Sequence, residues 1–105
     1  MKIFVLFNLR KDVTVADYEK WAKTTDIPVV NNLPSIDKFS VFRTTGVLGG
    51  GMSPPYQYIE VVEIADEAQF GVDASTDQMK TIAAEFQKLA DNPIFITTSA
   101  LEAAE

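Results

Sequence analysis

The sequence predicts an α+β fold in which four antiparallel strands form one sheet and two helices cover one of its faces. Segments with alternating apolar residues indicate strands, and two segments with apolar residues at helical spacing stand between them. Proline and glycine clusters separate these segments, and no linker, internal repeat or low-complexity stretch marks a boundary. The 105 residues are therefore expected to form a single domain, 1–105.

The first strand is predicted over residues 2–10, because both of its alternating sets of side chains are largely apolar. This pattern is typical of a strand that is covered on both faces. A helix follows, with Thr14 as its N-cap and apolar residues at helical spacing up to about Asp26. Pro28 and Pro34 are expected to prevent its continuation and to make the connection rigid.

The middle of the chain predicts two strands joined by a loop. The second strand is expected from Ser35 to about Leu48, and the third from Tyr56 to Ile64. Between them, residues 49–55 are rich in glycine and proline, which is typical of a loop. Four residues of the third strand share one face: Tyr58, Glu60, Val62 and Ile64.

The second helical region contains two possible caps. Asp66 is expected to cap a short turn through Phe70. Ser75 or Thr76 is expected to cap a longer helix, which Asn92 and the following proline end.

The last strand is predicted over residues 94–100, and residues 101–105 are expected to be a frayed tail. The resulting order, β-α-β-β-α-β, predicts a ferredoxin-like sheet with both helices on one face.

The uncovered face of this sheet is expected to be apolar, because the first and third strands are apolar on both faces. Monomers rarely expose an apolar patch of that size. We therefore expect a homodimer in which two sheets pack face to face as a dimeric α+β barrel. The alternative is a monomer whose outer face is more polar than this register indicates.

Composition excludes several classes of function. The formal net charge of -6 makes nucleic acid an unfavourable partner. The absence of cysteine and histidine removes thiolate chemistry, disulfides and the commonest general base and metal ligand, and no metal site is expected. The apolar N-terminal run is too short to span a membrane, so no membrane partner and a cytoplasmic protein are expected.

Asp26 is the strongest candidate for a catalytic residue. It stands beside a proline and close to Trp21 and Tyr18, where the first helix is expected to end over the sheet. Burial against aromatic residues, together with the helix C-terminus, is expected to raise the pKa of this carboxyl group. The alternative is a turn residue whose carboxylate bonds to a nearby backbone amide.

Asn8 and Glu60 are weaker candidates. Asn8 is the only polar residue in an apolar strand, and its amide either orients a substrate or bonds to a neighbouring strand. Glu60 is expected to form a structural ion pair with Arg43.

Aromatic and sulfur-containing side chains give a further candidate surface. By their spacing, Trp21, Tyr58, Met79, Phe86 and Phe95 are expected in the core. They would define a flat pocket for a planar, largely uncharged ligand if a cavity remains among them.

Several segments resemble a known family. Trp21, residues 28–30, residues 33–34 and Phe39 are similar to the dimeric α+β barrel superfamily, particularly its EthD-like branch. In that branch a histidine commonly precedes the small residue and proline, and this chain has Asp26 there.

Three segments resemble the RedY/HapK-type proteins of prodiginine pigment biosynthesis more closely: Lys2–Leu9, Asp26–Pro28 and Tyr56–Val61. The resemblance implies a homodimer with a pocket in each subunit, pyrrolic precursors as ligands, and other pathway enzymes as possible partners.

The leading hypothesis is an accessory enzyme without cofactor that assists a proton transfer, such as dehydration, cyclisation or aromatisation of a pyrrolic intermediate. Asp26 would move the proton, Asn8 or Tyr58 would hold a polar atom, and Trp21 would stack on the ring. Tyr18 and Phe86 would complete the binding surface. Two alternatives are a non-catalytic carrier or chaperone and a cofactor-free oxygenase.

Overall fold

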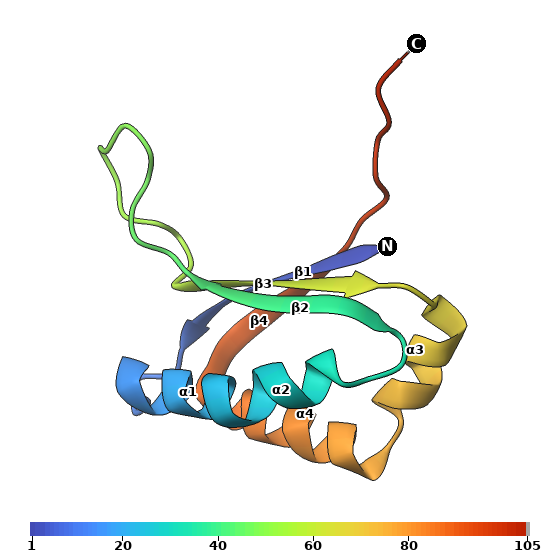
Figure 1. Ribbon diagram of the computed structural model, residues 1–105. Coiled ribbons are helices and arrows are strands. Elements are labelled where there is room, and N and C mark those ends of the chain that lie inside the picture. The colour runs from blue at the N-terminus through green and yellow to red at the C-terminus, as the bar shows by residue number, and fades with distance from the viewer. Residues whose placement is uncertain (105) are drawn as a thin grey trace.

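The computed structural model describes residues 1–104, whose elements alternate between strands and helices (Figure 1). The elements are β1 (Lys2–Leu9), α1 (Val15–Trp21), the π-helical turn η1 (Ala22–Asp26), α2 (Ile27–Asn31), β2 (Ile36–Arg43), β3 (Tyr58–Ile64), α3 (Glu67–Ala74), α4 (Asp77–Leu89) and β4 (Ala90–Thr97).

The four strands form one sheet in the order β2-β3-β1-β4, and every neighbouring pair is antiparallel. All helices lie on one face of the sheet, as Figure 1 shows. The predicted ferredoxin-like α+β architecture is therefore confirmed.

The first helical region begins as predicted but ends later. The Thr14 hydroxyl accepts a hydrogen bond from the amide of Asp17 at 3.1 Å and caps α1. The expected end near Asp26 is wrong, because the helix continues through Pro28 to the end of α2. The turn η1 explains this. It has the wider hydrogen-bond spacing of a π-helix, in which the amide of Ile27 donates to the carbonyl of Ala22, five residues earlier. This wider spacing accommodates a proline in the next turn.

The strands on either side of the long loop are shorter than predicted. β2 ends at Arg43 rather than near Leu48, and β3 begins at Tyr58 rather than Tyr56. Residues 44–57 leave the sheet on the side without helices (Figure 1). Three consecutive glycines, 49–51, have φ between 77° and 90°, a backbone region that favours glycine.

The second helical region consists of two capped helices. The Asp66 carboxylate caps α3 by accepting from the amide of Gln69 at 3.0 Å, and α3 extends beyond the predicted short turn to Ala74. Thr76, not Ser75, caps α4.

β4 begins at Ala90, four residues before the predicted start. Asn92 and Pro93 therefore lie within the strand instead of separating it from α4. They form an irregularity opposite β1, where Leu6 pairs with Ile94 and Asn8 pairs with Asp91. A proline is tolerated there because β4 is an edge strand and its ladder is already interrupted.

The core lies between the sheet and the helices. Its aromatic centre combines Phe7 of β1, Tyr18 of α1 and Tyr58 of β3, each at most 1% exposed. Phe7 meets Tyr18 edge-on at 5.5 Å and stacks on Tyr58 at 5.4 Å. A second cluster under α2 and α3 contains Val30, Ile36, Phe39, Val62 and Ile64.

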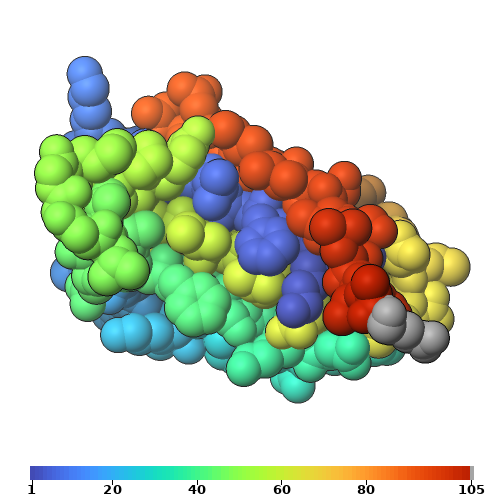
Figure 2. Space-filling view, turned by 90° about the horizontal axis from the view of Figure 1, so that it is seen from above, coloured from blue at the N-terminus to red at the C-terminus, as the bar shows by residue number. Residues whose placement is uncertain are grey.

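Among the described residues, no element covers the opposite face of the sheet, which carries a band of apolar side chains. Pairing in register produces one row of side chains across the four strands: Phe42, Ile59, Leu6 and Ile94. A second row on the same face contains Val61, Phe4 and Ile96. We call these seven residues the bare apolar face. Figure 2 looks onto it, between the 44–57 loop in green and the C-terminal segment in red.

β4 ends at Thr97 rather than at the predicted Ala100, and residues 98–104 have no regular secondary structure. Glu105, the last residue of the expected tail, lies outside the described residues. Within residues 1–104, none of the helices combines the length and apolar character that a membrane span requires.

Asn31 connects the last turn of α2 to the free edge of β2. Its side-chain amide donates to the carbonyl of Phe39 at 2.9 Å and accepts from the amide of Phe39 at 2.8 Å. Two hydrogen bonds to one backbone position fix the end of the helix that carries Val30 into the core.

We predict that Asn31→Ala lowers the free energy of unfolding by about 1 to 3 kcal/mol, because it leaves both polar groups of Phe39 without these partners. Chemical denaturation measures this change. The neighbouring Asn32→Ala serves as the control and is expected to stay within about 0.5 kcal/mol. Equal effects of the two substitutions would contradict the role of Asn31.

Candidate functional site

A cavity of about 180 Å³ lies between the helices and the covered face of the sheet. Its wall is apolar except for two carboxyl groups and one amide, contributed by Asp26, Glu60 and Gln87. The apolar lining residues are Ile3, Val5, Val30, Phe39, Val62, Phe70, Met79, Ile82, Ala83, Phe86 and Phe95. Such a mainly apolar hollow with a few convergent polar groups is the usual form of a small-molecule site.

Asp26 is the last residue of η1 and is 4% exposed. It lies inside a continuous helical region, so the helix C-terminus expected beside it is absent. The alternative was a turn residue whose carboxylate bonds to a nearby backbone amide; Asp26 is instead helical, and its side chain makes no cap hydrogen bond to α2. The π turn directs the carboxyl group toward the cavity, and π turns of this kind are frequent at functional sites.

Glu60 is the second carboxyl group of the cavity, and its role was missed from the sequence. It is 5% exposed and lies on β3 between Val5 of β1 and Val41 of β2. Its Oε2 atom is buried and has no hydrogen-bond partner among residues 1–104. The signal in the sequence is the alternation of β3, which places Glu60 on the same face as the buried Val62.

The expected ion pair between Glu60 and Arg43 is wrong. In the antiparallel register Arg43 stands opposite Tyr58, two residues from Glu60 and nearer the strand end. There its guanidinium group lies 3.3 Å from the carboxylate of Glu19 on α1. Glu60 thus has no cationic partner among the residues that line the cavity.

Burial raises the pKa of both cavity acids. For Asp26, burial raises the pKa to about 7. For Glu60, burial acts first and the negative charge of Asp26 acts second, so that its pKa rises to about 8, although the nearby Tyr18 hydroxyl opposes this rise. Two neighbouring acids that titrate near neutral pH can donate and accept protons at the same site.

Tyr18 lies close to the two acids. Its side chain is fully buried, and its hydroxyl group makes no hydrogen bond within the part of the chain that the structure describes. Burial, followed by the charges of Glu60 and Asp26, raises the pKa of Tyr18, so the phenol stays neutral. Tyr18 is therefore a potential hydrogen-bond donor beside the acids.

Tyr58 belongs to a second hollow, of about 230 Å³, which opens beside α1 and also contains Tyr18. The Tyr58 hydroxyl donates to the Glu19 carboxylate at 2.8 Å, and Lys23 lies 4.0 Å from the same carboxylate. Burial and the bond to Glu19 raise the pKa of Tyr58. Its hydroxyl is thus engaged away from the carboxyl pair.

The remaining predicted site residues are divided between the cavity and its surroundings. Phe86 lines the cavity. Trp21 stacks on Phe86 at 6.4 Å outside it, and its indole N–H donates to Glu85 at 2.7 Å. Asn8 lies elsewhere: its amide donates to the carbonyl of Pro55 and accepts from the amide of Gln57, so it anchors the long loop. The sequence alternative was a bond to a neighbouring strand, and the observed partners lie instead in the loop just before β3.

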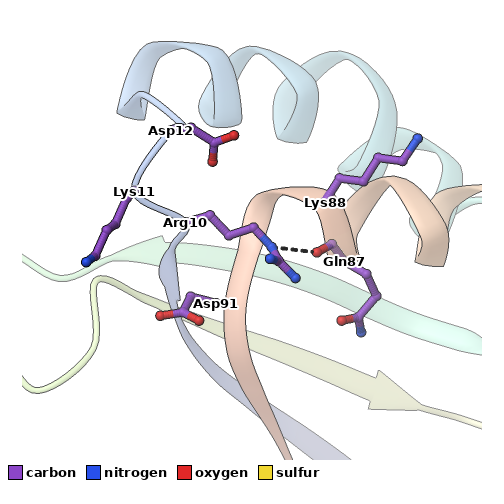
Figure 3. Close-up of a pocket in the computed structure, with 6 residues that line it drawn as sticks. All are labelled: Arg10, Lys11, Asp12, Gln87, Lys88 and Asp91. Atoms are coloured by element: carbon purple, nitrogen blue, oxygen red, sulfur yellow. Dashed lines mark hydrogen bonds between the residues drawn. The ribbon is translucent and has the colours of Figure 1, made fainter.

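A larger hollow of about 760 Å³ lies at the end of β1, but its chemistry is different (Figure 3). It is lined by Arg10, Lys11, Asp12, Gln87, Lys88 and Asp91, all of which are exposed. Arg10 donates through Nε to the backbone carbonyl of Gln87 at 2.9 Å and so closes the last turn of α4. This hollow lacks buried reactive groups and apolar walls, and we assign the site to the smaller cavity.

Comparison with known proteins gives the family. Residues 1–101 match the family model described as REDY-like protein HapK. The chain belongs to the REDY-like HapK family. The resemblance inferred from the sequence is thereby confirmed. A search of curated protein sequences found no relative.

Solved structures share the fold of this HapK-family chain. HapK from Hahella chejuensis matches with a TM-score of 0.71 at 24% identity, covering 100% of this chain and 99% of that one. A dimeric protein of unknown function with a ferredoxin-like fold, from Bacteroides fragilis, matches at 0.63 and 16%, covering 90% of each chain. Hydroxynitrile lyase from Passiflora edulis matches at 0.80 and 10%, covering 99% of this chain and 95% of that chain.

The carboxyl pair predicts an unusual dependence of stability on pH. Because the pKa values of Asp26 and Glu60 are raised in the folded state, folding retains protons that the unfolded chain releases above about pH 4. The resulting stabilisation is complete below that pH and is lost as the pH rises through about 7 and 8. The free energy of unfolding should fall by roughly 2 to 5 kcal/mol between pH 5 and 8.5.

Denaturant titrations across this range measure the effect, and the absence of histidine leaves few other side chains that titrate there. Glu60→Gln is expected to flatten the profile. Glu63→Gln, on the opposite face of β3, is expected to leave it unchanged. A wild-type stability that is constant or rises with pH would contradict the buried, protonated pair.

Proposed function

We propose that this chain is a cofactor-free protein of prodiginine-type pigment biosynthesis that assists a proton transfer on a planar pyrrolic intermediate. The observation that carries this proposal is the pair of buried carboxyl groups, Asp26 and Glu60, in an otherwise apolar cavity. Membership of the REDY-like HapK family supports the pathway. Phe86 and the other apolar walls suit a flat ring system.

The chemistry follows from the raised pKa values. Near neutral pH the pair holds between one and two protons, so one carboxyl group can protonate a leaving hydroxyl or a ring carbon. The other can remove a ring proton in the same step. Dehydration, cyclisation or aromatisation needs this combination of acid and base. A well-placed acid or base accelerates such a step by about 10² to 10⁴-fold.

Asp26→Asn and Glu60→Gln should each lower turnover of a bipyrrole substrate at least about 100-fold while the fold is retained. Product formation followed by mass spectrometry measures turnover, and circular dichroism verifies the fold. Asp17→Asn and Glu63→Gln are matched controls outside the cavity and should retain full activity. Undiminished turnover in both cavity variants would refute the acid–base role.

Binding is measured separately through Trp21, the single tryptophan, which stacks on the cavity residue Phe86. A bipyrrole that quenches its fluorescence but is recovered unchanged would identify the chain as a carrier instead. Product that forms only with oxygen uptake would identify a cofactor-free oxygenase.

The functional unit that we propose is a homodimer joined through the bare apolar face. Phe42, Ile94 and Ile96 on this face are between 40% and 54% exposed. The 44–57 loop and the C-terminal segment rise on the same side and carry the exposed Leu48 and Leu101 (Figure 1). The related fold from Bacteroides fragilis is described as dimeric, which supports this arrangement.

Light scattering is expected to give twice the chain mass of 11.6 kDa. Phe42→Glu should produce monomers, because a charge on this face loses hydration when two sheets meet. Val72→Glu introduces the same charge at a 60% exposed position on α3 and should leave the dimer intact. A wild-type monomer at micromolar concentration would overturn the proposed assembly.

A further inference from the structure

The polar end of the cavity contains acids without any compensating cation. Glu60 and Asp26 are 5% and 4% exposed, and the Oε2 atom of Glu60 has no hydrogen-bond partner in residues 1–104. Gln87 is the only other polar residue of the lining, which contains neither lysine nor arginine. A buried carboxyl group without a partner is costly, so the arrangement calls for a ligand that supplies one.

Two cationic side chains of the second hollow, which Tyr18 also lines, are occupied elsewhere. Arg43 and Lys23 both lie against the Glu19 carboxylate. Among residues 1–104, the titratable groups that act on Glu60 are Asp26 and the phenol of Tyr18. Since Tyr18 is neutral, the described residues that line the cavity offer the pair no positive charge.

We propose that the cavity selects a planar nitrogen base and binds it as its cation, with Glu60 as the counter-ion and Asp26 as the second hydrogen-bonding group. This inference deepens the proposed function and rests on it, because it names the chemical class of ligand that the same site takes. An amidine-type or imine-type heterocycle fits this description. A ligand that carries a carboxylate does not.

The binding step is a proton transfer that balances without any further reagent. When the base arrives uncharged, the O–H bond of one carboxyl group breaks and an N–H bond forms on the ligand. When the base arrives already protonated, the same carboxyl group releases its proton to the solvent. Either way the result is an N–H⁺···O⁻ hydrogen bond, which is shorter and stronger than a neutral one.

Two ring systems of similar shape separate this proposal from binding by shape alone. The probe is 2-aminobenzimidazole, a planar base with N–H groups on one edge, and its counterpart is 2-methylindole, which has no basic nitrogen. Isothermal titration calorimetry on the full chain measures both affinities. Repeating the titration at pH 6 in two buffers of different ionisation enthalpy gives the number of protons released.

The base is expected to bind at least tenfold more tightly than 2-methylindole and to release about one proton at pH 6, where the free carboxyl pair is protonated. Glu60→Gln should remove both the preference and the proton release, whereas Glu63→Gln should retain them. Indole-2-carboxylate should bind more weakly than either probe.

Equal affinity of the two probes for the wild-type chain, with no proton released, would overturn the ligand class and leave the acid–base proposal standing. That result needs no variant, so it holds even if Glu60→Gln fails to fold. Absence of binding by both probes and by a bipyrrole would overturn the cavity as a ligand site, and the proposed function with it.

Discussion

The helices cover only one face of a sheet that is apolar on both, and the rest of the structure depends on this asymmetry. On the covered face, the aromatic packing of Phe7, Tyr18 and Tyr58 holds α1 against the sheet. The cavity remains farther along the same face, beneath α2 and α4. On the other face, no helix or strand of residues 1–104 covers the side chains that would form a second core. One sheet thus accounts both for a site between sheet and helices and for a surface suited to a partner.

The site buries two carboxyl groups at positions where core packing alone would favour apolar side chains. Replacing Glu60 and Asp26 by apolar residues of similar size would remove a desolvation cost, because neither acid has a cationic partner in the part of the chain that the structure describes. Burying these two acids costs folding free energy, and residues that carry such a cost are typical of functional sites. Burial also shifts their proton equilibria into the neutral range, which is the property that acid–base chemistry requires.

The sequence predicted features that depend on neighbouring residues better than features that depend on the register of distant strands. The caps at Thr14 and Asp66 follow from local hydrogen bonding and were predicted correctly. Pro28 was misjudged as a helix breaker, because a π turn is a rearrangement of backbone bonds that apolar spacing does not reveal. Glu60 was given the wrong partner, because two residues of register separate it from Arg43 and only the folded sheet brings Glu19 to that arginine.

The burial of the acids is the central claim, and NMR observation of the side-chain carboxyl carbons during a pH titration tests it most directly. In a chain labelled with ¹³C, the account predicts two carboxyl resonances with midpoints near 7 and 8, belonging to Asp26 and Glu60 and displaced when either is substituted. If every carboxyl group titrated near its ordinary value of about 4, the two acids would be solvated and ionised at neutral pH. That result would contradict the assignment of the site.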